Sequence, residues 1–245
     1  MTDPLFLADV SHAVPGEVVT VSGPEGRHAA VVKRMRPGEG VLLADGAGAG
    51  IRGVVDAVAK ESITVRVNEL IAREHGPLRM VAVQALAKGE RSDIAVEAMT
   101  ELGVDEIIAW QASRSIVRWQ AKAEKGLAKW RSAATSATKQ SRRLTIPAVS
   151  AATTGDIAHR LSRADLALVL HESATEPLAD IDLPPHGECI FVIGPEGGIA
   201  PDELEQFEAV GAHRVSVSDA VLRASTAGVV ALAQLQAISR RLRTP

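Results

Sequence analysis

The most constraining feature of the chain is a buried strand that ends at a glycine-rich turn and continues into a helix. Residues 190–193 are four consecutive apolar residues, which is typical of a strand covered on both faces of a sheet. Residues 194–198, with the sequence Gly-Pro-Glu-Gly-Gly, end this strand. Pro201 suits the first turn of a helix, and Asp202 and Glu203 complement the positive end of its dipole. The segment therefore predicts a strand, a glycine loop and a helix.

A glycine loop at the carboxyl end of a strand is the usual place for a ligand in an open α/β sheet. Gly197 and Gly198 carry no Cβ atom, so their backbone amides can come close to a ligand. The same residues also suit a tight strand-to-helix turn that binds nothing. The loop by itself leaves both interpretations open.

The composition indicates a globular protein with one large domain or two modest ones. The chain has 245 residues, 46% of them hydrophobic, which suffices for a substantial core. No apolar run approaches the length of a membrane span, and residues 1–4 do not begin a secretory signal. We therefore expect a cytoplasmic protein without membrane contact.

Cysteine and histidine usage argues against a disulfide or a metal site. Cys189 is the only cysteine, and its place beside an apolar strand predicts a buried thiol. The histidines are scattered without ligand spacing, and His171 with Glu172 lacks the second histidine of a zinc-binding helix. Neither a phosphate-binding loop ending in Gly-Lys-Ser/Thr nor a Gly-x-Ser-x-Gly elbow is present. Nucleotide and ester hydrolysis therefore lack support, and we expect no metal.

Charge is distributed unevenly along the chain. The net charge is −3, but residues 114–143 hold nine basic residues and the single acid Glu124. A solvated helix face is one explanation of such a run. The imbalance nevertheless favours a polyanionic partner over a neutral metabolite.

The first 72 residues predict a small β-barrel. Short β-branched segments separated by Gly, Pro and Asp occupy residues 18–21, 40–44, 51–55 and 62–67. Between two of them, Asp45-Gly46 predicts a hairpin turn. A second basic cluster, for which RNA contact and a solvated helix end are equally good explanations, comprises Arg27, His28, Lys33, Arg34 and Arg36.

From residue 73 onward strands alternate with helices, which predicts a mostly parallel sheet. The expected strands are residues 79–86, 104–110, 165–170, 190–193 and 213–217. The expected helices are residues 93–102, residues 120–143, short helices from 154 and 201, and a last one capped by Ser225 or Thr226.

Apolar spacing predicts which face of each helix is buried. In residues 93–102 this face carries Ile94, Ala95, Ala98, Met99 and Leu102. In residues 120–143 the basic side chains are expected to point outward, away from Ala123, Leu127, Trp130, Ala134 and Ala137. In the last helix the inward positions are Val229, Val230, Leu232, Ala233, Leu235 and Ile238.

Three strand ends fall within the last third of the chain, at residues 171–172, 194–198 and 216–223. If their strands are neighbours, these loops form one pocket.

At these loops the sequence resembles a known family. Residues 194–198 together with residues 221–227, Val-Leu-Arg-Ala-Ser-Thr-Ala, are similar to the paired signature of the ribosomal RNA small-subunit uridine-N3 methyltransferases of the SPOUT superfamily. The similarity spans the chain, and it includes His28, residues 34–39, Asp45-Gly46, Lys88, residues 100–104, Arg114-Ser115, residues 140–142 and Pro147.

The resemblance implies an α/β protein of two domains. Residues 1–72 would form a PUA-like β-barrel that binds RNA, and residues 73–245 a SPOUT methyltransferase domain with a deep trefoil knot. General topology rules would argue against a knot, so this expectation comes from the family alone. The resemblance also implies a homodimer, S-adenosylmethionine as methyl donor, and as acceptor a uridine of 16S rRNA within an assembled small ribosomal subunit.

Carried over position by position, the resemblance assigns site residues. The cofactor contacts fall on Leu170, His171, Glu172, Gly194, Pro195, Glu196, Gly198, Ser216, Val217, Ser218, Val221, Leu222, Thr226 and Ala227. Backbone groups of these loops would contact the adenine edge, while Ile193, Val217 and Leu222 would supply apolar walls. RNA contacts are expected at Arg27, His28, Arg34, Arg36, Arg114, Arg142 and Arg143. The family's last motif usually has Gly, Arg and Glu where this chain has Ser218, Ala220 and Ser225.

Two residues are candidates for catalysis. A guanidinium at Arg223 would stabilise the negative charge that develops on a uracil carbonyl, and its alternative role is a structural pairing with residues 226–242 or with the partner subunit. Glu196 is the nearest candidate base, and it is equally suited to orienting backbone or ribose hydroxyls.

Two other functions remain open on the sequence. One is an RNA-binding module without catalysis, because neither the basic segment nor the barrel requires a reaction. The other is a methyltransferase that acts on a different RNA or on a ribose 2′-hydroxyl, because a cofactor pocket does not name the acceptor.

Overall fold

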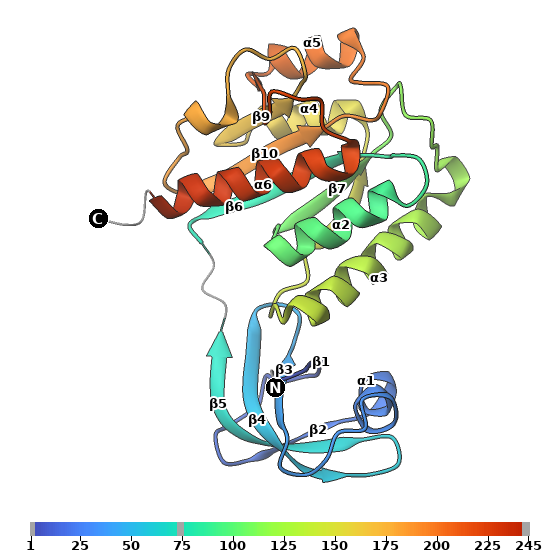
Figure 1. Ribbon diagram of the computed structural model, residues 1–245, viewed down its shortest axis with the longest axis vertical. Coiled ribbons are helices and arrows are strands. Elements are labelled where there is room, and N and C mark those ends of the chain that lie inside the picture. Colours follow the sequence, from blue (N-terminus) through green and yellow to red (C-terminus); the bar gives the residue numbers. More distant parts are fainter. Residues whose placement is uncertain (1–2, 73–75, 242–245) are drawn as a thin grey trace. The chain divides into compact units, whose positions relative to one another are not determined.

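The computed structural model describes residues 3–72 and 76–241, and the chain divides into two compact units (Figure 1). The first consists of Met1–Glu74 with Thr135–Ile146, and the second of His75–Ala134 with Pro147–Pro245. The break near residue 74 lies close to the expected domain boundary at 72. Thr135–Ile146 differs from the expectation, because it clusters with the first unit although it follows most of a helix that begins in the second.

A curled five-stranded sheet forms the first unit (Figure 1). Its strand order is β1-β3-β4-β5-β2, with β1 parallel to β3 and the other pairs antiparallel. Among the described residues no strand pair joins β1 to β2, so closure into a barrel stays a prediction. The strands are β1 (Leu5–Leu7), β2 (Val18–Val21), β3 (Gly40–Ala44), β4 (Ala49–Val58) and β5 (Ile63–Ala72).

The core of this unit lies inside the curl. Phe6, Leu43, Ile51 and Val65 are almost fully buried there, and the short helix α1 (Gly23–Arg27) with the π-helical turn His28–Val32 packs its Ala29 against them. The predicted hairpin turn between β3 and β4 is confirmed. Its geometry is fixed by the Asp45 carboxylate, which accepts hydrogen bonds from the backbone of residues 47–49 at 2.7–3.0 Å.

The segment Thr135–Ile146 completes the first unit through polar and apolar contacts. The Nζ atom of Lys139 lies 2.6 Å from Oε1 of Glu25, and the Lys139 side chain is only 17% exposed. The prediction that the basic residues of this helix all point outward is therefore wrong for Lys139, because an acidic partner lies within reach. Leu144 packs against the small apolar cluster of Leu5, Leu42 and Ala44.

The second unit contains the predicted parallel sheet, with the order β11-β9-β10-β6-β7-β8. All five strand pairs are parallel, as expected for strands that alternate with helices. The strands are β6 (Leu78–Ala85), β7 (Glu106–Trp110), β8 (Ala148–Ala152), β9 (Leu166–Leu170), β10 (Gly187–Ile193) and β11 (His213–Val215). The helices are α2 (Arg91–Leu102), α3 (Ala123–Ser141), α4 (Thr154–Leu161), α5 (Pro201–Ala209) and α6 (Ala224–Arg241).

Apolar side chains on the two faces of this sheet are covered by different helices. On one face, Ile157 of α4 and Leu204 and Phe207 of α5 pack against strand residues such as Val83 and Val192. On the other face, α6 packs against α2, β6 and β10 (Figure 1). The central strands β10 and β6 are thus covered on both sides, as their continuous apolar sequence predicts.

Two helices and one strand differ from the sequence predictions. Ile94 of α2 is 49% exposed, because the buried face is rotated toward Ser92, Ala95, Val96, Met99 and Thr100. Helix α6 begins at Ala224, so Ser225 and Thr226 lie inside its first turn and do not cap it, and Ala233 of the same helix is exposed. The strand expected at 213–217 ends at Val215, where the chain turns into the loop that follows.

An ionic cluster occupies the amino-terminal edge of the sheet. Glu106 accepts from Arg160 at 2.6 and 2.8 Å and from Arg79 at 2.6 Å, while both arginines also contact Glu188 at 2.9 Å. Burial by itself would raise the pKa of Glu106, but the two guanidinium groups outweigh it and lower that pKa. The cluster fixes the strand starts at the edge opposite the glycine loop.

None of the helices within residues 3–72 and 76–241 is long and apolar enough to cross a membrane.

Candidate functional site

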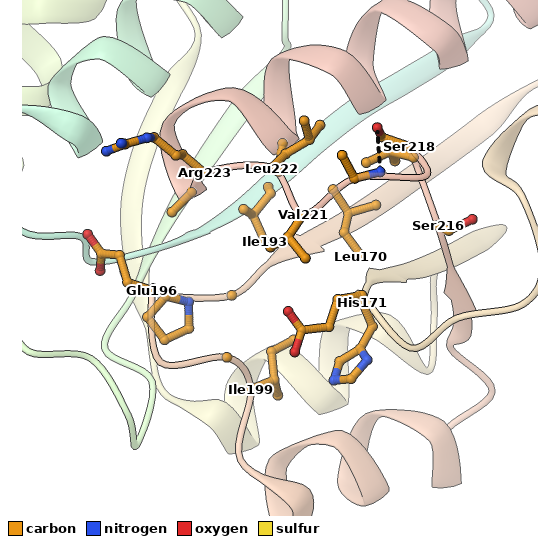
Figure 2. Close-up of a pocket in the computed structure, with 18 of the residues that line it drawn as sticks. Leu170, His171, Ile193, Glu196, Ile199, Ser216, Ser218, Val221, Leu222 and Arg223 are labelled. Atoms are coloured by element: carbon orange, nitrogen blue, oxygen red, sulfur yellow. Dashed lines mark hydrogen bonds between the residues drawn. The ribbon is translucent and has the colours of Figure 1, made fainter.

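A pocket of about 370 Å³ opens at the carboxyl ends of β9, β10 and β11, entirely within the second unit (Figure 2). The strand register explains why these ends meet. Ile193 of β10 pairs with Leu170 of β9, and Leu170 pairs with Val215 of β11. The three loops that follow therefore leave the sheet at one place, as the sequence predicts for neighbouring strands.

Nearly all predicted cofactor residues line this pocket. Thr226 is the exception, because the first turn of α6 directs it away, with its hydroxyl donating to the Arg223 carbonyl at 3.2 Å. The lining residues that were predicted are Leu170, His171, Glu172, Gly194, Pro195, Glu196, Gly198, Ser216, Val217, Ser218, Val221, Leu222, Arg223 and Ala227. Ile193 also lines the pocket, as expected for an apolar wall, whereas Arg91, Ile199 and Ala224 line it without having been predicted.

Arg91 is the important omission. It stands on the first turn of α2, about a hundred residues before the glycine loop, and no local pattern in the sequence connects the two. The available signal was its place in the chain after β6. Because β6 pairs in parallel with β10, the segments that follow these two strands leave the sheet at the same edge.

Glycine is structurally required in the loop after β10. Gly198 has a φ of +73°, and a Cβ atom at Gly194 would stand 2.8 Å from Cγ1 of Ile199. Gly197 packs against the backbone of Arg114, which leaves 3.2 Å for a Cβ atom. At these three glycines no side chain stands in the way, so the loop backbone can lie close to its neighbours.

Apolar side chains supply the walls of the pocket. Leu170, Ile193 and Ile199 are buried, and Leu222 is half-buried (Figure 2). Such walls, surrounded by backbone amides and carbonyls at strand ends, suit a flat heteroaromatic group.

The loop after β11 is held in place by hydrogen bonds along its length. The Ser216 carbonyl accepts from the backbone of Leu178 at 2.8 Å, and the Val217 carbonyl accepts from Nε2 of Gln234 at 2.9 Å. Ser218, which replaces the family's usual glycine, accepts from the backbone of Ala220 at 3.2 Å (Figure 2). The turn is therefore formed with a serine at this position.

One end of the pocket carries the ionisable residues Glu196 and Arg223 (Figure 2). Oε1 of Glu196 accepts from the backbone of Lys88 at 3.0 Å and from Nη1 of Arg91 at 2.9 Å. Partial burial would raise the pKa of Glu196, but hydrogen bonds from its own backbone, from Lys88 and from Arg91 lower it overall. Glu196 is therefore a firmly ionised acceptor and a weak base.

Arg223 is exposed at the rim of the pocket, immediately before α6. Within the described part of the chain its guanidinium makes no ion pair, so it is available to a ligand. Of the structural roles considered for Arg223, an ion pair with the described residues 226–241 is absent, and pairing with a partner subunit stays a prediction.

Most residues predicted to contact RNA belong to the first unit. Arg27, His28, Arg34 and Arg36 follow one another around α1 and the turn after it, while Arg142 and Arg143 directly follow α3 within the segment Thr135–Ile146. His28 lies edge-on to Phe6 and 3.4 Å from Nζ of Lys139. Arg114 instead belongs to the second unit, where its Nη1 lies 3.4 Å from the Gly197 carbonyl.

The described residues contain no group of three or more His, Cys, Asp or Glu side chains that could hold a metal ion.

The comparisons with known proteins concern both the sequence and the fold. Residues 74–236 match the model of the RNA methyltransferase domain. The ribosomal RNA small subunit methyltransferase E of Mycobacterium bovis is 43% identical over 92% of this chain and 88% of its own length. The chain belongs to this methyltransferase family.

Two solved structures extend the family likeness to the fold. A ribosomal RNA small subunit methyltransferase E from Neisseria gonorrhoeae, bound to S-adenosyl methionine, is 28% identical with a TM-score of 0.84, covering 97% of this chain and 98% of its own. A methyltransferase from Legionella pneumophila in complex with the same cofactor gives the same identity, coverage and TM-score. Members of the family therefore bind this cofactor on the fold described above.

The pocket of this chain fits such a cofactor on its own features. Its volume lies at the lower end of the range typical for small-molecule sites, about 300–1,000 Å³. The loop glycines leave a cradle that Cβ atoms would fill, the walls are apolar, and an ionised carboxylate stands at one end. An adenine ring, ribose hydroxyls and an ammonium group each find a matching surface.

Proposed function

We propose that the protein methylates N3 of a specific uridine in 16S rRNA with S-adenosylmethionine as the methyl donor. The observation that carries the proposal is the pocket itself, in which three strand-end loops surround apolar walls and Arg223 stands at the rim without an ion pair to any described residue. Membership of the ribosomal RNA small subunit methyltransferase E family supports the choice of acceptor.

The residues that would hold the cofactor are those of the three loops. Leu170, Ile193 and Leu222 would enclose the adenine ring, and the backbone of residues 194–198 and 216–222 would contact its polar edge. When bound, S-adenosylmethionine supplies a methyl group activated by its sulfonium. The chain's own task is to align the acceptor and to exclude water.

Arg223 is the proposed catalytic residue. N3 of uridine must lose its proton to become nucleophilic, and the resulting charge spreads over the two neighbouring carbonyl oxygens. A guanidinium hydrogen-bonded to one of these oxygens stabilises that charge as it develops. The exposure of Arg223 beside the pocket and its lack of an ion pair among the described residues support this role.

Glu196 is better suited to binding than to proton transfer. A carboxylate that already accepts from Lys88 and Arg91, and whose pKa is lowered, has little tendency to take a proton from uridine. Of the two roles that the sequence leaves open, we therefore favour the orientation of hydroxyl or ammonium donors.

The basic residues of both units are the proposed RNA contacts. In the first unit these are Arg27, His28, Arg34, Arg36, Arg142 and Arg143, and in the second unit Arg114 beside the glycine loop. The protein has no Tyr and only three Phe, so stacking on aromatic rings is minor. Recognition by charge and shape, as on an assembled small ribosomal subunit, suits such residues best.

The proposal includes the finer features of the family fold. We infer that the curled sheet closes as a PUA-like barrel, that the loops of the second unit form a trefoil knot, and that the protein acts as a homodimer in the cytoplasm, where ribosomal subunits are made. A knot would explain how separate loops are held together around one pocket.

The test is methyl transfer to small ribosomal subunits from cells that lack this gene. Subunits are incubated with the protein and S-adenosylmethionine carrying a labelled methyl group, and the product is mapped by reverse transcription. Methylation at N3 blocks the Watson–Crick edge, so we expect label together with one new stop at a uridine. Label without a stop would indicate a ribose or another atom as acceptor, and absence of label with RNA still bound would indicate a binding module.

A further inference from the structure

The ion pair between Arg91 and Glu196 joins two loops of the pocket. Arg91 is the first residue of α2, and its Nη1 donates to Oε1 of Glu196 at 2.9 Å. The backbone of Lys88 donates to the same oxygen at 3.0 Å. The turn between β6 and α2 therefore holds one oxygen of a carboxylate that lies on the glycine loop.

The other oxygen of Glu196 has a different environment. Among the described residues no side chain donates to Oε2, and Glu196 itself lines the pocket. A carboxylate can accept hydrogen bonds on both oxygens. The side chains of Glu196 and Arg91 are 21% and 38% exposed, so the pair is partly shielded from water. The Glu196 backbone amide also donates to this carboxylate, and no other described group holds Oε2, so this oxygen can accept a hydrogen bond from a ligand.

The glycine loop gives Glu196 little rigidity of its own. Gly194, Gly197 and Gly198 surround it, and glycine restricts the backbone less than any other residue. A glutamate side chain also loses rotamer freedom when it binds a ligand. The two hydrogen bonds to Oε1 fix the carboxylate before a ligand arrives, which reduces that entropic cost.

We propose that Arg91 is a positioning residue that holds Oε1 of Glu196 and thereby directs Oε2 toward a hydrogen-bond donor of the bound cofactor. The donor is a ribose hydroxyl or the ammonium of the methionine part, which share this chemistry. The inference rests on the proposed function only for the identity of the cofactor.

Calorimetric titration with S-adenosylmethionine tests the proposal by a double-mutant cycle. We expect Arg91→Ala and Glu196→Gln each to weaken binding on the order of tenfold, the size expected for loss of a charge-assisted hydrogen bond. If Arg91 acts through Glu196, the double variant binds no more weakly than Glu196→Gln alone. Additive losses, or full affinity in Arg91→Ala, would overturn the proposal.

Lys129→Ala is the matched control. Nζ of Lys129, on α3, lies 2.6 Å from Oδ2 of Asp93, which is in the same first turn of α2 as Arg91. Neither Lys129 nor Asp93 lines the pocket. We expect Lys129→Ala to leave the affinity for S-adenosylmethionine unchanged. Arg91→Lys keeps a positively charged donor at this position, so we expect it to retain most of the affinity that Arg91→Ala loses. An equal loss in Lys129→Ala would mean that the helix is generally disturbed and would count against a specific role of Arg91.

Two cofactor analogues distinguish the possible donors. S-adenosylhomocysteine has both the ribose and the ammonium, whereas methylthioadenosine has the ribose alone. Weaker binding of both by Glu196→Gln identifies a ribose hydroxyl, and weaker binding of the first alone identifies the ammonium. No change with either analogue contradicts the proposal.

These measurements do not depend on turnover. Coupled binding without methyl transfer would support the role of Arg91 and reject the proposed reaction. A wild-type chain that does not bind S-adenosylmethionine would reject both.

Discussion

Gly228 of α6 lies directly against Ile193, the last residue of β10. A Cβ atom at Gly228 would stand 3.2 Å from Cγ1 and Cδ1 of Ile193, and 2.9 Å from Sδ of Met99 in α2. The absence of a side chain at one position therefore sets how closely α6 covers the strand that leads into the pocket, because Ile193 is also part of the pocket wall.

Gly228→Ala should lower the stability of the protein. Overpacking a buried site costs about 1–3 kcal/mol, which exceeds the gain of at most about 1 kcal/mol from replacing glycine by alanine within a helix. Thermal unfolding measures the difference. The control is Gly155→Ala in α4, where the nearest atom to a new Cβ is 3.9 Å away, and there we expect unchanged or higher stability. Equal melting temperatures for the two variants would contradict the packing argument.

Glu106→Gln should destabilise the protein in a pH-dependent way. The folded state lowers the pKa of Glu106, so the ionised carboxylate contributes stability above the ordinary glutamate pKa of about 4.3. That contribution is lost as pH falls through the lower pKa of the folded state. Urea unfolding should therefore show a deficit of about 1–3 kcal/mol near neutral pH that shrinks in acid.

The exposed pair of Arg52 and Glu69, 3.3 Å apart, is the comparison for this prediction. Glu69→Gln breaks an ion pair at the surface and should cost less than about 1 kcal/mol at neutral pH. A deficit for Glu106→Gln that persists undiminished in acid would mean that the ionised cluster is not its cause.

Arg223→Ala should abolish most methyl transfer while cofactor binding stays intact. Loss of a group that stabilises developing charge lowers kcat on the order of 10²–10³-fold. Single-turnover methylation measures the rate, and calorimetry measures the affinity for S-adenosylmethionine. Survival of the rate would remove Arg223 from the mechanism, and loss of affinity would assign it to the cofactor.

Replacement of Arg34, Arg36 and Arg142 by Ala should weaken RNA binding and flatten its salt dependence. Each lost phosphate contact reduces the slope of log affinity against log salt by about 0.7–0.9. Filter binding over a salt series gives the slope. Arg163→Ala, at the exposed end of the second unit's α4, is the control and should change neither quantity. An unchanged slope in the triple variant would exclude these residues from the RNA contact.

Cys189 should be unreactive in the folded protein. Burial, and to a lesser extent the charge of Glu188, raises the pKa of Cys189 to about 12, so the thiolate that reacts with disulfide reagents is scarce. We expect a thiol reagent to label Cys189 only after denaturant is added. Rapid labelling of the native protein would show that β10 opens readily.

Local patterns in the sequence predict the sheet and most of the pocket. The apolar run of β10, the glycines after it and Pro201 each act on their immediate neighbours, so their structural meaning can be read from short segments. The parallel order of strands then brings three loops together, which is why so many predicted residues line one pocket.

Long-range contacts account for what the sequence does not predict. Arg91 reaches Glu196 across a pair of neighbouring strands, and Lys139 turns inward because Glu25 is near in space but not in sequence. Ile94 was expected inside because Ile94, Ala95 and Ala98 permit two helical faces, and packing against α6 selects the other one. Closure of the barrel, the knot and the homodimer stay predictions.

The inclusion of Thr135–Ile146 in the same compact unit as Met1–Glu74 has a consequence for biosynthesis. A chain growing on the ribosome presents all five strands of the curled sheet before residue 75, yet the partner of Glu25 and the leucine that covers Leu5 and Leu42 arrive only with Lys139 and Leu144. The nascent sheet lacks these contacts until residues 75–134 of the second unit have been translated, so maturation of the amino-terminal unit is delayed by that time. A fragment that ends at residue 74 would lack Lys139 and Leu144, so its sheet would never gain these contacts.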